Sequence, residues 1–205
     1  MFNLSIYDET DQEKVITFMK ENSFAVITGF GDEYPVATHI PLEIEIRDDG
    51  KIFLSGHMMK KTDHHLAFEK NPNVLVIFNG PHCYVSASWY STPGIGSTWN
   101  YITVHAKGTL RFKNEEGTYQ AVKAITNKYE GTETNGAFDK LPQEYVQRMV
   151  KAIVGFSIEV ETLDNIFKLS QDRDQQSRHN IVRHLMERGD ADSKAIAEEI
   201  SNRNP

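Results

Sequence analysis

The stretch Phe78–Gly108, FNGPHCYVSASWYSTPGIGSTWNYITVHAKG, decides how this sequence is interpreted. It contains both Trp residues and the single Cys of the chain, on either side of a loop at Thr92–Ser97. β-Branched and aromatic residues precede the loop, and Trp99–Phe112 alternates between apolar and polar positions, the period of a half-buried strand. The stretch therefore predicts two strands joined by a loop. The large aromatic side chains around this loop are typical of a pocket or an interface, and equally of a core.

The composition is that of an ordinary globular protein. The chain has 205 residues, of which 39% are hydrophobic and 25% charged, enough for one domain with a substantial core. No apolar run approaches the roughly 18 residues of a membrane span, and the first residues do not resemble a secretory signal. A single Cys cannot form an internal disulfide, so a reducing, cytoplasmic location is expected. The net charge of −7 disfavours a protein that binds DNA with its whole surface.

The periodicity elsewhere predicts several more strands and a few helices. Strands follow strands through short turns, without the alternation of strand and helix that builds a parallel sheet. This order predicts a mainly β protein with peripheral helices (α+β), and favours an antiparallel barrel over a sandwich. Further strands are expected at 24–30, 34–46, 51–57 and 153–160 and within 163–171, and helices at 11–21, 62–70, 114–129, 143–151, 175–187 and 192–201. We expect a β-barrel domain at 1–172 and a helical appendage at 173–205.

The sequence contains none of the familiar catalytic or nucleotide-binding motifs. There is no P-loop, no Gly-x-Gly-x-x-Gly between a strand and a helix, and no His-Glu-x-x-His. The eight histidines match no standard metal-ligand spacing, so no metal site is predicted. Cys83 lies in an apolar, strand-like run, where a cysteine is usually a small buried hydrophobe rather than a nucleophile. No residue is assigned a catalytic role.

Three short segments are suited to an anionic, planar ligand. The first, Ala37–Pro41, sets polar groups into a strand. The second, Leu54–Lys61, ends a strand in a small-residue turn and places two lysines before a helix, where a phosphate would meet positive charge and free backbone N–H groups. The third, Phe167–Gln171, adds Lys, Ser and Gln. Together with Trp99 they would suit a flavin, although each segment alone is equally typical of a solvated surface or a turn.

The same segments carry a resemblance to a known family. In order along the chain, THIP, LSGHM followed by a basic residue, VIFNGPHCYVSASWY, TWNY with VHAKG, IVGFSIEV and FKLSQ resemble the PaiB-type FMN-binding negative transcriptional regulators. The resemblance extends from the first helix to about Arg173. It implies a split antiparallel β-barrel of the FMN-binding type, FMN as the cofactor, and a homodimer with the flavin at or near the interface. It also implies a cytoplasmic repressor of sporulation genes and of degradative-enzyme (protease) genes.

The resemblance also implies which residues bind the flavin. They are Thr38, His39, Ser55, Gly56, His57, Lys60, Lys61, Trp99, Asn100, Lys168, Ser170 and Gln171. Lys60 stands where the family often has Arg; a lysine holds a phosphate as a point charge and not as a bidentate fork, which predicts weaker binding. The loop Thr92–Ser97 is richer in Gly and Ser than the family pattern leads us to expect.

The residues after Arg173 are the part that the resemblance covers least. Two helical patterns there could form a helix-turn-helix, but from Asp172 to Pro205 six basic residues face seven acidic ones. A helix that reads DNA should be more basic, so dimer packing or a lid is favoured, with promoter DNA as a possible partner. The alternative function is an FMN-dependent oxidoreductase of the flavin-reductase or pyridoxine-phosphate-oxidase kind, because the same barrel serves flavin enzymes.

Overall fold

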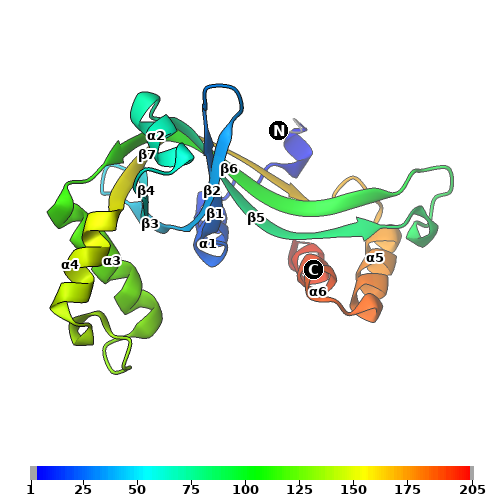
Figure 1. Cartoon of the computed structure of the whole chain (residues 1–205). Helices are drawn as coiled ribbons and strands as arrows, with labels where there is room; N and C mark the ends of the chain where they lie inside the picture. Colours follow the sequence, from blue (N-terminus) through cyan, green and yellow to red (C-terminus); the bar gives the residue numbers. More distant parts are fainter. Residues whose placement is uncertain (1–3, 204–205) are drawn as a thin grey trace. The chain divides into compact units, whose positions relative to one another are not determined.

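The fold was examined in a computed structural model, which describes residues 4–203. Within that range the strands are β1 (Phe24–Gly29), β2 (Val36–Pro41), β3 (Glu43–Ile46), β4 (Ile52–Met59), β5 (Asn73–Val85), β6 (Thr98–Phe112) and β7 (Ile153–Lys168). They form one seven-stranded sheet in the order β2-β1-β5-β6-β7-β4-β3 (Figure 1). The fold class predicted from the sequence, a mainly β protein of the split antiparallel barrel type, is confirmed.

The helices lie outside the sheet, as predicted. They are α1 (Gln12–Glu21), α2 (Asp63–Lys70), α3 (Glu115–Glu130), α4 (Gln143–Ala152), α5 (Gln175–Arg188) and α6 (Ala191–Arg203), with short 3-10 turns at Ser5–Tyr7, Ala87–Trp89 and Phe138–Lys140. Each predicted helix is present and begins and ends within two residues of the expected positions. Capping explains this agreement, because the side chains of Thr62, Asn114 and Asp174 accept hydrogen bonds from the first turns of α2, α3 and α5.

Three strand boundaries differ from the prediction. The expected strand 34–46 is divided into β2 and β3 because Pro41 has no N–H to donate and the next residue, Leu42, is fully buried, with its N–H on the Ser23 carbonyl. The strand before the loop ends at Val85, where the Ser86 hydroxyl accepts from the Ser88 N–H and starts a 3-10 turn. The two strands expected after residue 152 are one strand, β7, since neighbouring strands satisfy its backbone even where its side chains are polar.

The contacts divide the chain into two compact units. The sheet unit comprises residues 19–78 and 105–163, and the hairpin unit comprises residues 4–18, 79–104 and 164–203 of the described chain. Both are built from β5, β6 and β7, whose residues belong partly to each unit. These divisions do not coincide with the boundary expected after residue 172, and the separation of an FMN-binding domain from an appendage stays a prediction.

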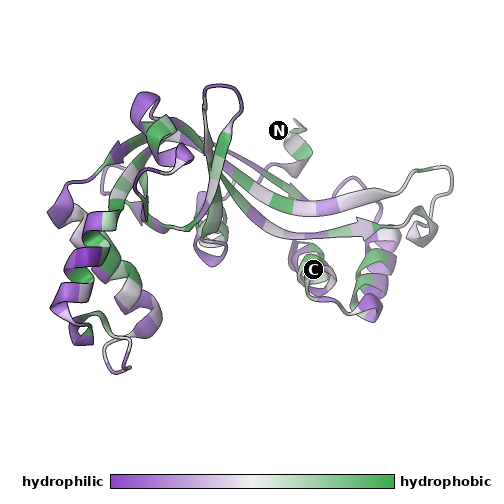
Figure 2. Cartoon of the chain, in the orientation of Figure 1, coloured by the Kyte–Doolittle hydropathy of each residue, from purple (hydrophilic) through white to green (hydrophobic). Residues whose placement is uncertain are grey.

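The sheet unit is organised around β4. Strand β4 pairs antiparallel with β3 on one side and with β7 on the other, where residues 53–59 oppose residues 153–159. One face of β4 is buried, through Ile52, Leu54, Gly56 and Met58, while the intervening side chains are half-buried. Helices α3 and α4 lie side by side (Figure 1) over a small core of Val122, Phe138, Val146, Val150 and Ile153. The hydropathy alternates along the strands accordingly (Figure 2).

The hairpin unit combines the distal parts of β5 and β6 with α5 and α6. The two helices pack on each other and bury Ile181, Leu185, Ile196 and Ile200. Asp174 caps α5 and also accepts from the Ser91 hydroxyl, so that the loop after β5 is attached to the start of the helix. At the other end of α5, the Arg188 guanidinium donates to the Tyr84 carbonyl and lies 5.0 Å from the centre of the Trp89 ring.

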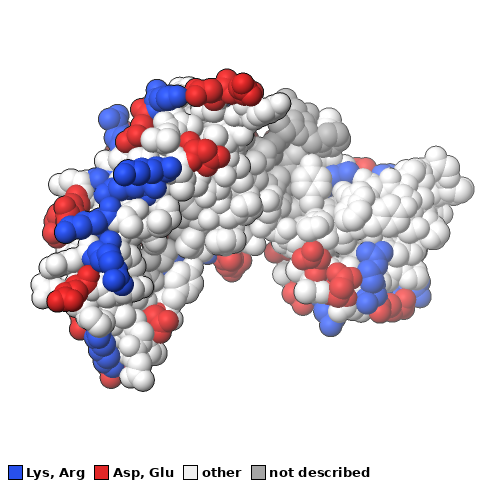
Figure 3. Space-filling view, viewed as in Figure 1, with Lys and Arg blue, Asp and Glu red and all other residues white. Residues whose placement is uncertain are grey.

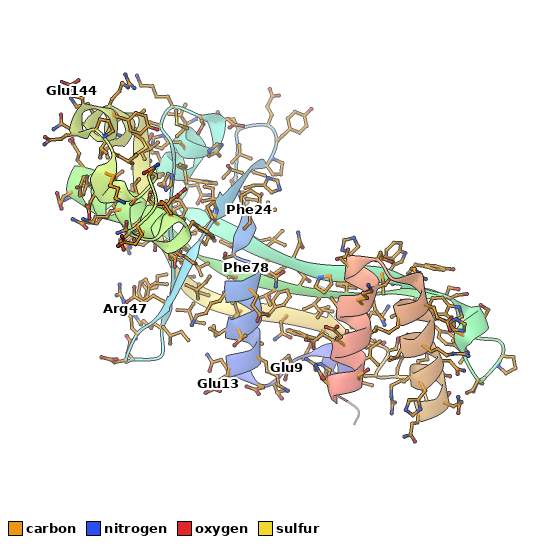
Figure 4. The ribbon with its side chains drawn as sticks, turned by 90° about the horizontal axis from the view of Figure 1, so that it is seen from below. Glu9, Glu13, Phe24, Arg47, Phe78 and Glu144 are labelled. Atoms are coloured by element: carbon orange, nitrogen blue, oxygen red, sulfur yellow. The ribbon has the colours of Figure 1, made fainter. Side chains whose placement is uncertain are left out.

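A nearly buried ion pair joins the ends of the hairpin unit. The Glu9 carboxylate contacts the Arg203 guanidinium near the end of α6, and the two side chains are only 8% and 19% exposed. Figure 4 shows Glu9 beside this helix. The backbone of Glu9 is held as well, because its N–H donates to the Asn165 amide oxygen and its carbonyl accepts from the Asn165 amide nitrogen.

We predict that Glu9→Gln lowers the free energy of unfolding by about 1–3 kcal/mol, since the partly desolvated guanidinium keeps only the more distant and more exposed Glu199 carboxylate, at 3.6 Å, as a charged partner. Urea unfolding followed by circular dichroism measures the change. The control is Glu33→Gln, which alters an exposed carboxylate in the turn between β1 and β2 and should change the free energy by less than about 0.5 kcal/mol. Equal effects of the two substitutions would contradict a stabilising role for the pair.

Candidate functional site

The twelve residues predicted to bind flavin fall into two groups. The sheet unit contains Thr38, His39, Ser55, Gly56, His57, Lys60 and Lys61, and the hairpin unit contains Trp99, Asn100, Lys168, Ser170 and Gln171. Strands β2 and β4 and the start of α2 position the first group, and β6 and the end of β7 position the second.

Strand β2 presents the first two residues at an edge of the sheet. Thr38 is half-buried opposite Ile27 of β1, and His39 is exposed opposite Val26. The His39 ring stacks on Phe24, with 6.0 Å between ring centres and 29° between planes. Phe24 is itself exposed, so the pair forms an aromatic surface on β1 and the edge strand β2. Such a surface can stack on a planar ring or pack against another protein surface.

Strand β4 places Ser55 and His57 on one face and Gly56 on the other. The small-residue turn expected at this point is wrong, because β4 continues to Met59. Gly56 is needed for packing: a Cβ there would lie 3.0 Å from the Phe156 ring and 3.2 Å from Ile40 Cγ2. The glycine thus lets β4 lie close to its buried neighbours, and the side chains of this segment that remain available to a ligand are those of Ser55 and His57.

His57 has a buried polar atom with no protein partner. Its Nδ1 is inaccessible to solvent and makes no hydrogen bond. Burial lowers the pKa of the His57 imidazole from its ordinary value, because the charged form loses its hydration. A buried, unsatisfied ring nitrogen is costly in a protein that has no ligand for it. His57 is therefore the residue of this group that most clearly points to a missing hydrogen-bonding partner.

Lys60 and Lys61 follow β4 directly. The Lys60 ammonium donates to the Lys151 carbonyl at 3.1 Å, at the C-terminal end of α4, and Lys61 adopts a left-handed conformation with φ of 64°. Both side chains are exposed. Figure 3 shows Lys and Arg side chains gathered over the α2 and α4 region of the sheet unit. The two ammonium groups can therefore approach an anion in solution.

The backbone at the start of α2 is less available than the sequence suggested. The His65 N–H donates to the Thr62 hydroxyl and the His64 N–H donates to the Asp63 carboxylate. Asp63 also contacts the His64 ring, and these hydrogen bonds lower the pKa of its carboxyl. Because the side chains already satisfy these donors, a phosphate here would be held chiefly by the lysine side chains.

Trp99 is the exposed member of the hairpin group. Its side chain is 54% exposed and lies beside two rings of β5, with centre-to-centre distances of 6.2 Å to His82 and 6.0 Å to Tyr84. Trp89 behaves differently: it is half-buried and stacks on His184 of α5 at 5.0 Å. Trp89 thus packs against α5, whereas the Trp99 ring is accessible; that Trp99 contacts the flavin stays a prediction.

The side chains of Asn100 and Ser170 hydrogen-bond to each other. The Asn100 amide nitrogen donates to the Ser170 hydroxyl at 2.9 Å, the hydroxyl lies 3.2 Å from the amide oxygen, and both residues are buried. Ser170 has φ of 59°, in the left-handed region that is strained for a residue with a side chain. The pair therefore holds the turn after β7 against β6, and its contribution to a ligand site would be to position that turn.

Lys168 and Gln171 flank the same turn. Gln171 closes it, since its side-chain amide accepts from the Leu169 N–H and donates to the Phe167 carbonyl. The Lys168 ammonium donates to the Thr98 hydroxyl and lies 5.9 Å from the centre of the Tyr7 ring. Burial lowers the pKa of Lys168, assisted by the Arg173 charge and opposed by Asp172. A partly dehydrated ammonium interacts strongly with an anion or with a ring carbonyl.

The structure adds four residues to the surroundings of Lys168 that the sequence did not single out. Tyr7, Asp172 and Arg173 interact with it, and Tyr90 lies beside Arg173, whose guanidinium is 4.8 Å from the Tyr90 ring centre; burial raises the pKa of both tyrosines. Arg173 also pairs with Asp172 at 3.2 Å. Asp172 and Arg173 could have been identified from the sequence, because they directly follow the FKLSQ motif. No sequence pattern connects Tyr7 with them.

The remaining candidates give no chemistry of their own. Cys83 is buried, as expected, and burial raises the pKa of its thiol to about 11, so it is a poor nucleophile at neutral pH. Among residues 4–203 no group of three or more His, Cys, Asp and Glu residues could hold a metal ion. In the same range no helix is long and apolar enough to cross a membrane.

The residues present fit FMN. The mononucleotide needs positive charge for its phosphate, hydrogen-bonding groups for its ribityl chain and ring edge, and flat surface for its ring system. The exposed ammonium groups of Lys60 and Lys61 supply the first. The unpartnered Nδ1 of His57 and the half-buried Ser55 hydroxyl, in the same unit, are groups of the second kind. Flat aromatic surface is present in each unit, at the stacked Phe24 and His39 rings and at the exposed Trp99 ring. That these residues bind FMN stays a prediction.

Comparison with known proteins defines the class of the chain. Residues 1–162 match the family model described as "Putative FMN-binding domain", so the chain belongs to this family of FMN-binding split barrels. Its flavin is FMN, in agreement with the cofactor expected from the sequence. The class is thus a PaiB-like flavin-binding protein.

Individual relatives match over nearly the whole chain, beyond the residues that the family model covers. It is 33% identical over 199 residues to the Bacillus subtilis "Protease synthase and sporulation protein PAI 2", covering 97% of this chain and 95% of that protein. It is 26% identical to an uncharacterised protein of Emericella nidulans, covering 99% and 97%. The family resemblance stated from the sequence is confirmed.

Solved structures agree with the fold. The FAD and heme binding protein of Mycobacterium smegmatis matches with a TM-score of 0.60 at 14% identity, covering 79% of this chain and 73% of that one. A flavocytochrome of Azotobacter vinelandii matches with a TM-score of 0.60 at 13% identity, covering 78% and 69%. At this identity the likeness establishes the fold alone.

The burial of His57 gives a prediction about pH. Because its folded pKa lies below its unfolded value near 6.5, the unfolded state takes up more protons as the pH falls through and below 6.5. The free energy of unfolding of the ligand-free protein should therefore decrease in that range, and the decrease should be smaller in His57→Asn. Urea unfolding from pH 7.5 to pH 5 measures both curves. Parallel curves for the parent and His57→Asn would mean that the pKa of His57 is the same in the folded and the unfolded protein.

Proposed function

We propose that this protein is an FMN-binding negative transcriptional regulator of the PaiB type, which represses sporulation genes and degradative-enzyme (protease) genes. The observation that supports it is the 33% identity, over nearly the whole of both chains, to the Bacillus subtilis protein whose name combines protease synthesis and sporulation. The flavin-binding region of the family covers most of the chain, so ligand binding and regulation would belong to one molecule.

The phosphate and the polar parts of the flavin would be bound by the sheet-unit group. Lys60 and Lys61 would neutralise the phosphate, and Ser55 and His57, which point from the same face of β4, would donate to or accept from the polar parts of the ligand. When bound, FMN supplies a planar, redox-active ring whose oxidation state a regulator can sense. The chain contributes the position of that ring and, through the partly buried Lys168, a cation that favours electron-rich forms of a nearby group.

A homodimer, cytoplasmic in location, fits this proposal. The aromatic surface of Phe24 and His39 lies on β1 and the edge strand β2, and the exposed Trp99 belongs to the hairpin unit. Exposed aromatic residues of this kind are enriched at protein interfaces. In a dimer, the sheet-unit group of one subunit and the hairpin-unit group of its partner can share one flavin, and each subunit would then complete the site of the other.

Lys60→Ala combined with Lys61→Ala should weaken FMN binding by about tenfold or more, because two charge-assisted contacts to the phosphate are removed. Quenching of flavin fluorescence on titration measures the dissociation constant. Riboflavin, which lacks the phosphate, serves as the matched ligand: its affinity should be the same for both proteins. The control variant is Lys70→Ala, which removes a lysine paired with Asp32 at the other end of α2. Unchanged FMN affinity in the double variant would remove the phosphate assignment.

Regulation and enzymatic turnover are separated by two assays on the FMN-loaded protein. For a repressor we expect a shift of promoter DNA in gels that weakens as salt rises from 50 to 200 mM, because phosphate contacts release counterions. We also expect no steady-state oxidation of NADH or NADPH above that of free FMN. FMN-dependent turnover of the nicotinamide with no DNA shift would favour the alternative, an FMN-dependent oxidoreductase on the same fold.

A further inference from the structure

Exposed cations gather on one surface of the sheet unit. Figure 3 shows Lys and Arg side chains over the α2 and α4 region. Four exposed cations belong to this region: Lys60 and Lys61, which follow β4, and Arg148 and Lys151 of α4. Together with the exposed Tyr145 we call them the α4 surface. This positive surface contrasts with the net charge of the chain, which is −7.

The packing of α4 decides which of its side chains lie on this surface. Val146 and Val150 are buried in the small core of the sheet unit. Arg148 and Lys151 are exposed and lie three residues apart, on the opposite side of the helix, so they are neighbours separated by about 4.5 Å along the helix axis. The burial of the valines thus directs both cations to solvent.

The two lysines extend the surface past the end of α4. The Lys60 N–H donates to the Ala152 carbonyl, and its ammonium donates to the Lys151 carbonyl at 3.1 Å. An ammonium group has three N–H donors, so this hydrogen bond leaves donors for an anion. The pairing of β4 with β7 therefore brings the cations of two distant segments into one group.

The cations of the α4 surface have no carboxylate partner. Elsewhere in the same unit, the ammonium groups of Lys123 and Lys128 each lie 2.7 Å from a carboxylate, that of Asp139 or Glu43. In the part of the chain that the structure describes, none of the four cations forms such an ion pair. The only acidic residue of α4 is Glu144, at its start (Figure 4). The positive charge is therefore available to an anionic partner.

A chain of phosphates fits this surface better than a single phosphate. One phosphate monoester carries up to about two negative charges, fewer than four cations require. A DNA duplex presents one negative charge for about every 1.7 Å of its axis, so α4, about 15 Å long, can face several phosphates. Tyr145 is 45% exposed, with its ring centre 5.8 Å from the Arg148 guanidinium, and its hydroxyl is a further donor to phosphate.

A membrane is a poorer partner for this helix. The solvent-facing residues of α4 are Gln, Glu, Tyr, Arg, Lys and Ala. They include no Leu, Phe or Trp, the side chains that a helix at a membrane surface inserts between lipids. The surface offers charge without an apolar face beside it, which favours a phosphate backbone in water.

We propose that the α4 surface is where this protein contacts the phosphate backbone of DNA. The inference rests on the proposed function as a transcriptional regulator, and it assigns the contact to the sheet unit rather than to α5 and α6, whose charges nearly balance. Lys60 and Lys61 also belong to the predicted flavin site. Arg148 and Lys151 do not, so substitutions of these two residues separate DNA binding from flavin binding.

The test uses the FMN-loaded protein and a fluorescein-labelled DNA duplex of random sequence, about 30 base pairs long, because phosphate contacts carry no sequence information. Fluorescence anisotropy measures the affinity between 50 and 200 mM salt. Arg148→Ala combined with Lys151→Ala should bind about tenfold more weakly at the lowest salt, and the slope of log K against log salt should become shallower by about 1.8, at about 0.9 for each phosphate contact.

Two further variants test whether the position of the charge matters. Lys123→Ala combined with Lys128→Ala removes the same charge from α3 and should change the affinity by less than about twofold, because each lysine is already paired with a carboxylate. Glu144→Gln removes the acidic residue of α4 and should strengthen binding by about twofold. Far-ultraviolet circular dichroism and an FMN affinity equal to that of the parent check that each variant is folded.

The outcomes distinguish this surface from the proposed function. Equal DNA affinity of the parent and the Arg148→Ala, Lys151→Ala variant would overturn the assignment and leave the regulatory function standing. Absence of binding by the parent to both random and promoter DNA would overturn both. Binding to vesicles of phosphatidylserine and phosphatidylcholine without binding to DNA would overturn the proposal in favour of a membrane surface.

Discussion

The antiparallel pairing of β4 with β7 is the constraint on which the sheet unit depends. Seven consecutive residues of β4, 53–59, oppose residues 153–159 of β7, and the Lys60 N–H continues the connection to the Ala152 carbonyl. A shift of one residue would exchange the two faces of β4 and turn Ser55 and His57 into the core. Gly56 suits this register, since a Cβ there would lie 3.0 Å from the Phe156 ring and 3.2 Å from Ile40 Cγ2, closer than an ordinary contact. The polar face of β4 is thus a consequence of how its apolar face packs.

The hairpin unit adds to its apolar core a set of polar side chains that satisfy each other. Asn100 with Ser170, Gln171 with the backbone of its own turn, and Glu9 with Arg203 each pair groups that would be costly to bury alone. Such contacts position Lys168 beside Thr98. Several residues that a motif comparison assigns to the ligand therefore act first on the chain itself, by fixing the backbone from which Lys168 and Trp99 project.

Much of the fold could be predicted from the sequence because local signals agreed with the tertiary structure. The alternation after Trp99 and the caps at Thr62 and Asn114 identify elements without reference to distant residues. The predicted strand and turn boundaries were wrong where the conformation of a segment depends on residues far away in the sequence. Strand β7 continues through polar residues because its backbone is paired, and the small residues at Ser55–Gly56 form strand rather than turn because β3 and β7 lie on both sides of them.

What the sequence determined by itself is the set of elements, the family and the chemical types in the candidate site, since periodicity, capping and ordered motifs are local properties. Only the tertiary structure decided which of those side chains are available. It buried Asn100 and Ser170 against each other, satisfied the N–H groups of α2 with Thr62 and Asp63, and left the His57 Nδ1 without a partner. It also placed Lys60 beside the end of α4. The physical reason is that burial and hydrogen-bond satisfaction depend on residues far apart in the chain, and no local pattern records them.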